Sequence, residues 1–219
     1  MKRIHITNGE IFNHWIKSQM NETFIPFNEA MMSYSTEGHL FDEFFCQHRA
    51  YCHGISVDVY TQKIKPFLDV VENLDEIDEL VLWFGQDAFC QMNLLTILSV
   101  LEDRNYTGLV QTVLFDENKD WKEVLHLQRR QRNISGSTSL FQKVLIEHHR
   151  VICDDEIMDH GIELYLDYLS DAGKLTKMIH HHPEMSEDEL IVLLLKESEE
   201  YGLSDVQAKD LIRKVRDTR

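Results

Sequence analysis

Side chains capable of acid–base or ligand-binding chemistry follow three apolar runs of this chain. They are Thr7, Asn8, Gly9 and Glu10 after the first run, Asn28 and Glu29 after the second, and Asp87 and Gln91 after the third. A carboxylate such as Asp87 or Glu29 can act as a general base or bind a metal ion, and an amide can orient a polar ligand. Whether these groups act together depends on the elements that carry them.

The stretch from Glu79 to Leu101 carries the clearest structural pattern. An apolar run at 80–84 stops at Gly85, and Asp87 then opens a long, mostly apolar segment with helical spacing. The pattern predicts a buried strand, a tight turn and a helix covered on more than one side. Asp87 is the expected N-cap, because its carboxylate can accept from free amides at the positive end of the helix. Gln91 follows one turn later on nearly the same face.

Further apolar runs predict strands at 3–6, 23–27 and 109–115, and helical spacing falls at about 11–20, 38–53 and 60–73. Strands that alternate with helices favour parallel pairing through right-handed crossovers. We therefore expect residues 1–118 to form a small α/β domain of the Rossmann type. Its sheet should be doubly wound, mainly parallel and four-stranded.

The rest of the chain is predicted to be all-α. Residues 119–138 are polar and are expected to form a linker to a helical domain at 139–219. Two capping boxes mark helix starts there, Ser186 with Glu189 and Ser204 with Gln207.

The carboxyl ends of parallel strands meet at one edge, where open α/β sheets bind ligands. The three polar sets are therefore expected to share one crevice that binds a small polar ligand. Each residue also has a purely structural interpretation, in which Asn8 shapes a turn, Asp87 caps a helix and Glu29 is solvated. Arg49 could balance an anionic ligand, or it could pair with Asp42 or Glu43.

The chain carries 38 acidic and 22 basic residues, a net charge of −16, which disfavours binding to nucleic acid or to an anionic membrane. It contains no apolar run near the roughly 20 residues needed to cross a bilayer. Its first residues enter a strand pattern rather than a signal peptide, so we expect a cytoplasmic protein. The four cysteines have no CxxC spacing and are expected to be reduced thiols.

Common catalytic and cofactor motifs are absent from the sequence. The turn after the first strand lacks the glycines of a phosphate loop, and no HExxH or GxSxG motif occurs. Histidines cluster at 180–182 and 148–149, but neighbours on a helix diverge by about 100°, so we expect surface histidines rather than a metal site. His5 is expected to be a packed core histidine. The sequence does not identify a cofactor.

The motifs resemble an uncharacterised bacterial domain family, number eighteen thirty-five among the domains of unknown function. The segment His5-Ile6-Thr7-Asn8-Gly9-Glu10 is similar to its HITNGD opening, and Leu82-Trp83-Phe84 with Asp87 and Gln91 is similar to its LWF-x-x-D-x-x-x-Q motif. Asn28-Glu29 occupies the place of a WRD-like segment, and Arg49-Ala50 matches an arginine–alanine pair. Glu10, Asn28-Glu29 and Cys90 depart from the family pattern. The resemblance spans roughly the first 120 residues and implies a shared site without an activity.

Two hypotheses follow. In the first, the α/β domain binds a small polar ligand, for which a nucleotide-like molecule is one candidate, with hydrolase or transferase chemistry that uses Asp87 or Glu29 as base. Asn8 and Gln91 would orient the ligand and Arg49 would balance an anion. In the second, the protein is a non-catalytic regulatory or interaction module, whose helical region binds a protein partner or a second copy of the chain. An enzyme should show a pocket with a raised carboxylate pKa, and an interaction module an exposed apolar patch.

Overall fold

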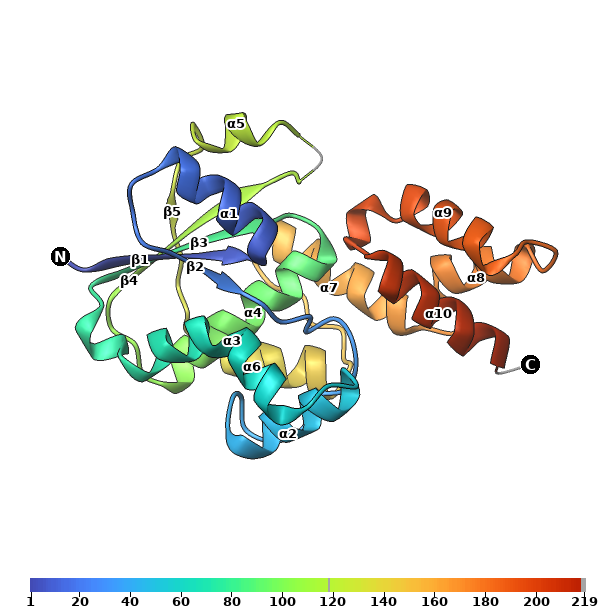
Figure 1. The fold of residues 1–219 in the computed structure, drawn as a ribbon, viewed down its shortest axis with the longest axis horizontal. Coiled ribbons are helices and arrows are strands. Elements are labelled where there is room, and N and C mark those ends of the chain that lie inside the picture. Colours follow the sequence, from blue (N-terminus) through green and yellow to red (C-terminus); the bar gives the residue numbers. More distant parts are fainter. Residues whose placement is uncertain (118, 218–219) are drawn as a thin grey trace.

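The computed structural model describes residues 1–117 and 119–217. Four parallel strands form the sheet, and a two-residue antiparallel strand adds one edge. The strand order is β2-β1-β3-β4-β5 (Figure 1). The strands are β1 (Arg3–Asn8), β2 (Phe24–Phe27), β3 (Glu79–Gly85), β4 (Leu109–Phe115) and β5 (Arg130–Gln131). The predicted α/β fold with a mainly parallel sheet is confirmed, with one strand more than expected.

Helices cover both faces of the sheet. On one face, Phe12 of α1 (Glu10–Gln19) packs with Trp83 and Phe115, beside the short α5 (Trp121–Val124). The other face carries α3 (Val57–Glu72) and α4 (Ala88–Asp103), and α2 (Glu43–Cys52) packs on α3. The short turn η1 (Leu74–Glu76) leads from α3 into β3.

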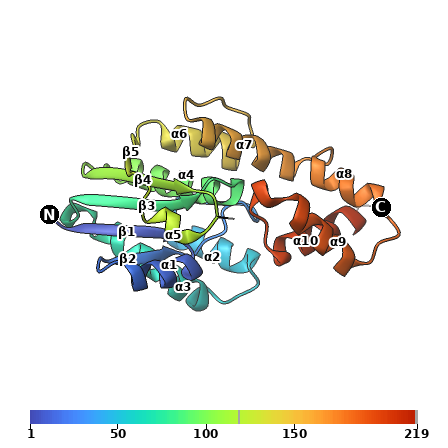
Figure 2. The ribbon, with the colours of Figure 1, turned by 90° about the horizontal axis from the view of Figure 1, so that it is seen from above.

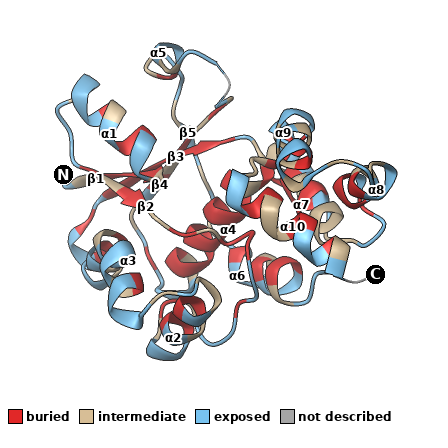
Figure 3. Ribbon diagram, turned by 45° about the vertical axis from the view of Figure 1, so that its right-hand side comes forward, coloured by how far each residue is buried: buried red, intermediate tan, exposed pale blue. Residues whose placement is uncertain are grey.

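Helix α4 is the centre of the apolar core. Nearly every residue from Ala88 to Leu101 is buried, as Figure 3 shows, because the sheet covers one side of α4 and later helices cover the other. Those helices are α6 (Ser137–Phe141), the π-helical turn Gln142–Ile146 and α7 (Glu156–Leu169). One continuous apolar core therefore joins the sheet to the helical region.

The remaining helices extend from one end of the sheet (Figure 2). They are α8 (Lys174–His181), α9 (Glu187–Glu197), the 3₁₀ turn η3 (Glu199–Tyr201) and α10 (Asp205–Asp217). Ser186 and Glu189 form the predicted capping box. Ser204 and Gln207 exchange the same two bonds, so both helix starts are confirmed. None of the helices among the described residues combines the length and apolar character needed to span a bilayer.

Two segments differ from expectation. Residues 119–138, predicted as a linker, contain α5, β5 and the start of α6. The reason is aromatic packing, since the ring of Trp121 lies edge-on to Phe12 at 5.3 Å. The helix expected from residue 38 begins only at Glu43, after a stretch in which Tyr34 and Phe41 have positive φ.

Candidate functional site

Asp87 sits where β3 ends and α4 begins. Its Oδ1 accepts from the amide of Cys90 at 2.9 Å, which makes it the N-cap that the sequence predicts. The turn requires a glycine at position 85, because a Cβ there would lie 2.8 Å from Cys90 Sγ and would collide with the Asp87 carboxylate. The local sequence Gly85-Gln86-Asp87 therefore folds the carboxylate back over the strand end.

Glu117, just beyond β4, completes a three-residue cluster with Asp87 and Cys90. One ligand atom from each lies within 4.8 Å of the others. Cys90 Sγ donates to Glu117 Oε1 at 3.2 Å, and Asn8 Nδ2 donates to Cys90 Sγ at 2.9 Å. Two carboxylates and a thiolate are donors that a divalent cation such as Zn²⁺ accepts. This cluster is the one part of the described chain where three such ligand atoms gather, and it contains no histidine.

The two carboxyl groups of this cluster hold protons more tightly than usual. Burial raises the pKa of Asp87, against the effect of the Cys90 amide. Glu117 is exposed as a residue, but its carboxyl group faces inward, and desolvation together with the Asp87 charge raises its pKa to about 7. Burial and the two carboxylates raise the pKa of Cys90 well above its usual value. Near neutral pH Glu117 therefore carries its proton part of the time beside Asp87, and Cys90 is a thiol rather than a nucleophilic thiolate.

The carboxyl pair faces a cavity of about 700 Å³ between the sheet edge and the helical region. Six carboxylates line it, against the ammonium group of Lys196 and the imidazole of His160. They are those of Asp87, Asp116, Glu117, Glu197, Glu199 and Glu200. Ser198 also lines the cavity, and its buried hydroxyl has no hydrogen-bond partner in the described part of the chain.

Gly202 allows the backbone of the helical region to lie against the Asp87 side chain. It has a positive φ of 68°, and a Cβ there would collide with the Asp87 carboxylate. His160 of α7 lies 3.6 Å from Glu200 on the same side. The loop between η3 and α10 therefore closes the cavity directly over the N-cap of α4.

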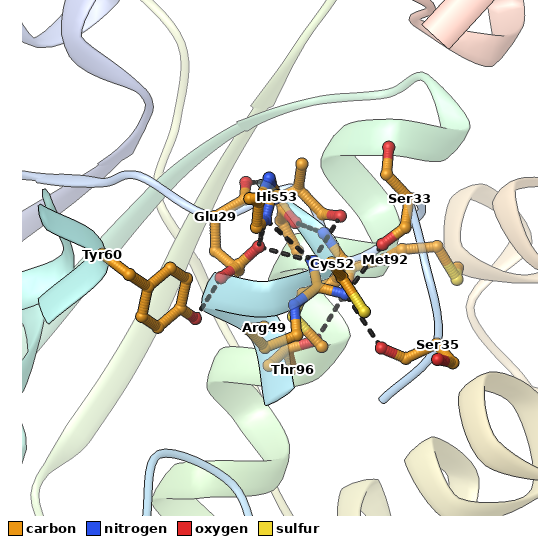
Figure 4. A network of polar contacts seen from close by, with 12 residues as sticks. Glu29, Ser33, Ser35, Arg49, Cys52, His53, Tyr60, Met92 and Thr96 are labelled. Carbon is orange, nitrogen blue, oxygen red and sulfur yellow. Dashed lines mark hydrogen bonds and ion pairs between the residues drawn. The ribbon is translucent and has the colours of Figure 1, made fainter. Parts of the chain in front are cut away.

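Glu29 and Arg49 lie in a separate buried network (Figure 4). Both side chains are 0% exposed, and Arg49 Nη2 donates to Glu29 Oε1 at 2.6 Å. His53 Nε2 lies 3.1 Å from the same oxygen, and the Tyr60 hydroxyl donates to Glu29 Oε2. Burial alone would raise the pKa of Glu29, but the hydrogen bond from His53 and the charge of Arg49 outweigh it and lower that pKa. A substrate has no open path to this carboxylate, and Arg49 pairs with neither Asp42 nor Glu43.

Asn93 connects the two polar regions. Its Nδ2 donates to Asn8 Oδ1 and to the Glu29 backbone carbonyl, each at 2.8 Å. Its Oδ1 accepts from the Met31 amide at 2.9 Å. This buried amide on α4 ties the ends of β1 and β2 to the helix that Asp87 caps.

The expectation of one shared crevice is wrong for most of the predicted residues. Asp87 lines the acidic cavity, whereas Asn8 lies outside its lining and donates to Cys90 Sγ. Thr7 faces α1, where its hydroxyl accepts from Asn13 at 2.8 Å. Side chains that leave one strand edge still diverge, because successive residues point to opposite faces of the sheet.

The other predicted residues make local bonds. Asn28 Nδ2 donates to Glu10 Oε1 at 2.7 Å, so these two pair with each other. Gly9, with φ of 77°, is the N-cap of α1. Gln91 Nε2 donates to the Gly85 carbonyl at 2.7 Å, within the turn that carries Asp87.

Sequence reasoning missed Glu117, Asn93, Tyr60 and His53. Glu117 had a usable signal, because it follows the fourth strand as Asp87 follows the third. Asn93 stood out only as a polar residue in an apolar helix. His5 fits its prediction, with Nδ1 accepting from Trp83 Nε1 at 2.9 Å in the core.

Comparisons of the chain with protein-family models, curated proteins and solved structures find no match. The resemblance to the bacterial domain family stays a prediction.

Proposed function

We propose that this protein is an acid–base enzyme that acts on a small polar molecule in the acidic cavity. The observation that carries the proposal is the proximity of the Asp87 and Glu117 carboxyl groups at the cavity wall, with one oxygen of each within 4.8 Å of the other and both pKa values raised. Paired carboxyls whose environments hold one proton between them are a recurrent acid–base device. Hydrolysis and group transfer are the reaction classes we expect.

The charge of the cavity favours a ligand with a positive group. Six carboxylates face Lys196 and His160, so the field favours an amine and opposes a free nucleotide. Arg49, which was expected to balance an anionic ligand, pairs instead with Glu29.

The two carboxyl groups are assigned different roles in proton transfer. Burial and the repulsion between them favour a state with one proton, so one group can donate a proton while its neighbour accepts one. Glu117 is the more accessible member and is assigned the exchange with the ligand. Asp87 is held by the Cys90 amide and keeps the geometry of the pair.

A divalent cation is the competing occupant of the same carboxyls. Asp87, Glu117 and Cys90 provide three donor atoms at suitable spacing, and a ligand would provide the fourth. A cation would replace the shared proton and would require Cys90 to lose its own.

A thermal-shift screen tests the proposal. The probes are putrescine, agmatine and spermidine, the ions Mg²⁺, Mn²⁺ and Zn²⁺, and ATP without metal as the anionic comparison. A ligand of the folded form raises its melting temperature by mass action. We expect at least one amine to stabilise the wild type and to lose that effect in Asp87→Asn and Glu117→Gln.

The matched control is Asp69→Asn, which removes an exposed carboxylate on α3 and should leave the amine effect intact. Stabilisation by Zn²⁺ alone, lost with Cys90→Ser, would replace the acid–base pair with a metal site. Equal responses of the wild type and Asp87→Asn to every probe would contradict the proposal.

A non-catalytic interaction module is the alternative. The large apolar residues exposed on the described helical region are Ile152, Val192 and Val206, and they belong to a loop, α9 and α10. These three side chains belong to three separate elements, whereas the acidic cavity gathers its carboxyl groups in one place, so the enzyme proposal takes precedence. The four free thiols fit the expected cytoplasmic location.

A further inference from the structure

A second cavity, of about 360 Å³, lies where the α/β region meets the helical region. It shares no lining residue with the acidic cavity. Its walls are the loop after β2, the residue His148, and facing positions of α7 and α10. Most of the lining is aromatic or aliphatic, with Tyr34, Tyr165, Tyr168, Leu169 and Leu211 among its members.

Two hydroxyl groups in this cavity have no hydrogen-bond partner among residues 1–117 and 119–217. Tyr165 is 3% exposed, and neither its hydroxyl nor that of Tyr168 forms a hydrogen bond with a described residue. Desolvation raises the pKa of Tyr168 to about 12, so this phenol stays protonated at neutral pH. Neither oxygen is among the fully buried polar atoms of the described residues that lack a partner, so both hydroxyls keep access to open space and can donate to a ligand that enters the cavity.

One wall of the cavity is held in a strained conformation. Tyr34 and His148 have φ of 64° and 53°, and both line the cavity. Such outliers persist only where surrounding bonds over-determine them, and they concentrate at ligand sites.

Hydrogen bonds from two side chains hold the segment around Tyr34 in place. Arg49 Nη1 donates to the carbonyls of Ser33 and Ser35, at 2.7 and 3.2 Å (Figure 4). From the opposite side, Gln207 Nε2 of α10 donates to Ser33 Oγ at 2.9 Å. The buried Glu29–Arg49 pair is therefore a positioning device for this wall.

Charge on the cavity wall is balanced. Asp210 contributes one carboxylate, which already accepts from the Tyr34 hydroxyl at 3.1 Å, and Lys214 contributes one ammonium group. The wall therefore carries one acidic and one basic group, and neither sign of ligand charge is favoured. A neutral ligand therefore suits the cavity best.

We propose that this cavity binds a neutral, planar aromatic molecule of one or two rings that carries a hydrogen-bond acceptor for Tyr165. The aromatic side chains supply stacking and edge contacts, and the unpartnered hydroxyls supply the donors. An apolar cavity of about 150 Å³ holds benzene, so about 360 Å³ accommodates two fused rings. The site is independent of the acid–base proposal.

The test compares quinoline with naphthalene, two ligands of nearly equal shape that differ by one ring nitrogen. Binding is measured by isothermal titration calorimetry and by saturation-transfer NMR at neutral pH. We expect quinoline to bind the wild type more tightly than naphthalene. Tyr165→Phe should weaken quinoline binding about threefold to tenfold, the usual value of one hydrogen bond, and leave naphthalene binding unchanged.

The matched control is Tyr51→Phe, which makes the same change at a side chain that is 85% exposed on α2 and should leave both affinities unchanged. Asp87→Asn should bind quinoline like the wild type, which separates this site from the acidic cavity. Circular dichroism verifies that each variant is folded. Failure of quinoline to bind the wild type, or equal binding by a folded Tyr165→Phe variant, overturns the proposal.

Discussion

Replacement of Arg49 with methionine should be among the most destabilising single changes in this protein. The substitution keeps much of the apolar stem but leaves the Glu29 carboxylate buried without its main counter-charge. It also frees the carbonyls of Ala30, Ser33 and Ser35, which accept from the guanidinium at 3.0, 2.7 and 3.2 Å.

The expected cost follows from the burial of the pair. Removal of one partner of a fully buried ion pair costs about 3–5 kcal/mol in the free energy of unfolding, because the remaining charge stays desolvated. Both side chains here are 0% exposed, so solvent screening gives no relief. A protein of this size loses about 2–4 °C in melting temperature per kcal/mol. The loss for Arg49→Met should therefore be of order 10 °C.

Urea denaturation followed by circular dichroism measures this change. Lys65→Met is the matched control, since Lys65 pairs with Asp69 at 2.6 Å on the surface of α3. Solvent screens that exposed pair, so its loss should leave the urea midpoint nearly unchanged. If Arg49→Met costs less than about 1 kcal/mol, the account of the buried network is refuted.

The remaining predictions concern pH, the carboxyl pair and its covering loop. Folding lowers the pKa of Glu29, so the ionised Glu29 stabilises the folded protein at pH values above the ordinary glutamate pKa. This stabilisation is lost as the pH falls below that value, so the stability of Glu29→Gln should depend less steeply on pH in acid. The effect of Glu117 on the pH dependence of stability has the opposite sign, because folding raises its pKa to about 7. The free energy of unfolding of the wild type should decline from about pH 4.3 to pH 7 relative to Glu117→Gln, and urea titrations at each pH measure it. Gly202→Ala should cost about 1–3 kcal/mol, because φ is positive and the new Cβ meets the Asp87 carboxylate; a melting curve within 1 °C of the wild type would contradict this contact. Cys90 should react with iodoacetamide more slowly than Cys52 at neutral pH, because burial and two carboxylates disfavour its thiolate; mass spectrometry of the labelled peptides decides the order.

Much of the scaffold could be predicted because periodicity reports burial directly. The strand–turn–helix unit at 79–101, the N-cap role of Asp87 and both capping boxes depend on neighbours in sequence, and all three are confirmed. The segment 119–138 was misjudged because Trp121 packs on Phe12, more than 100 residues away in sequence. A local pattern does not encode such a contact.

The candidate site was predicted only in part, for a geometric reason. A strand end places a residue at the sheet edge but does not decide which face its side chain takes. The Thr7 hydroxyl therefore lies toward α1. The Glu29 carboxylate pairs with Arg49, which belongs to α2. Asp87 alone among the predicted acids reaches the acidic cavity, where Glu117 and the helical region meet it.

The most direct test of the central claim is the titration of the Glu117 side-chain carboxyl carbon by NMR, in the wild type and in Asp87→Asn. The account predicts a pKa near 7 in the wild type and a lower value in Asp87→Asn, since the variant removes the neighbouring negative charge. A wild-type pKa near the ordinary value of about 4.3 would contradict the account. The same conclusion would follow if Glu117 titrated identically in both proteins.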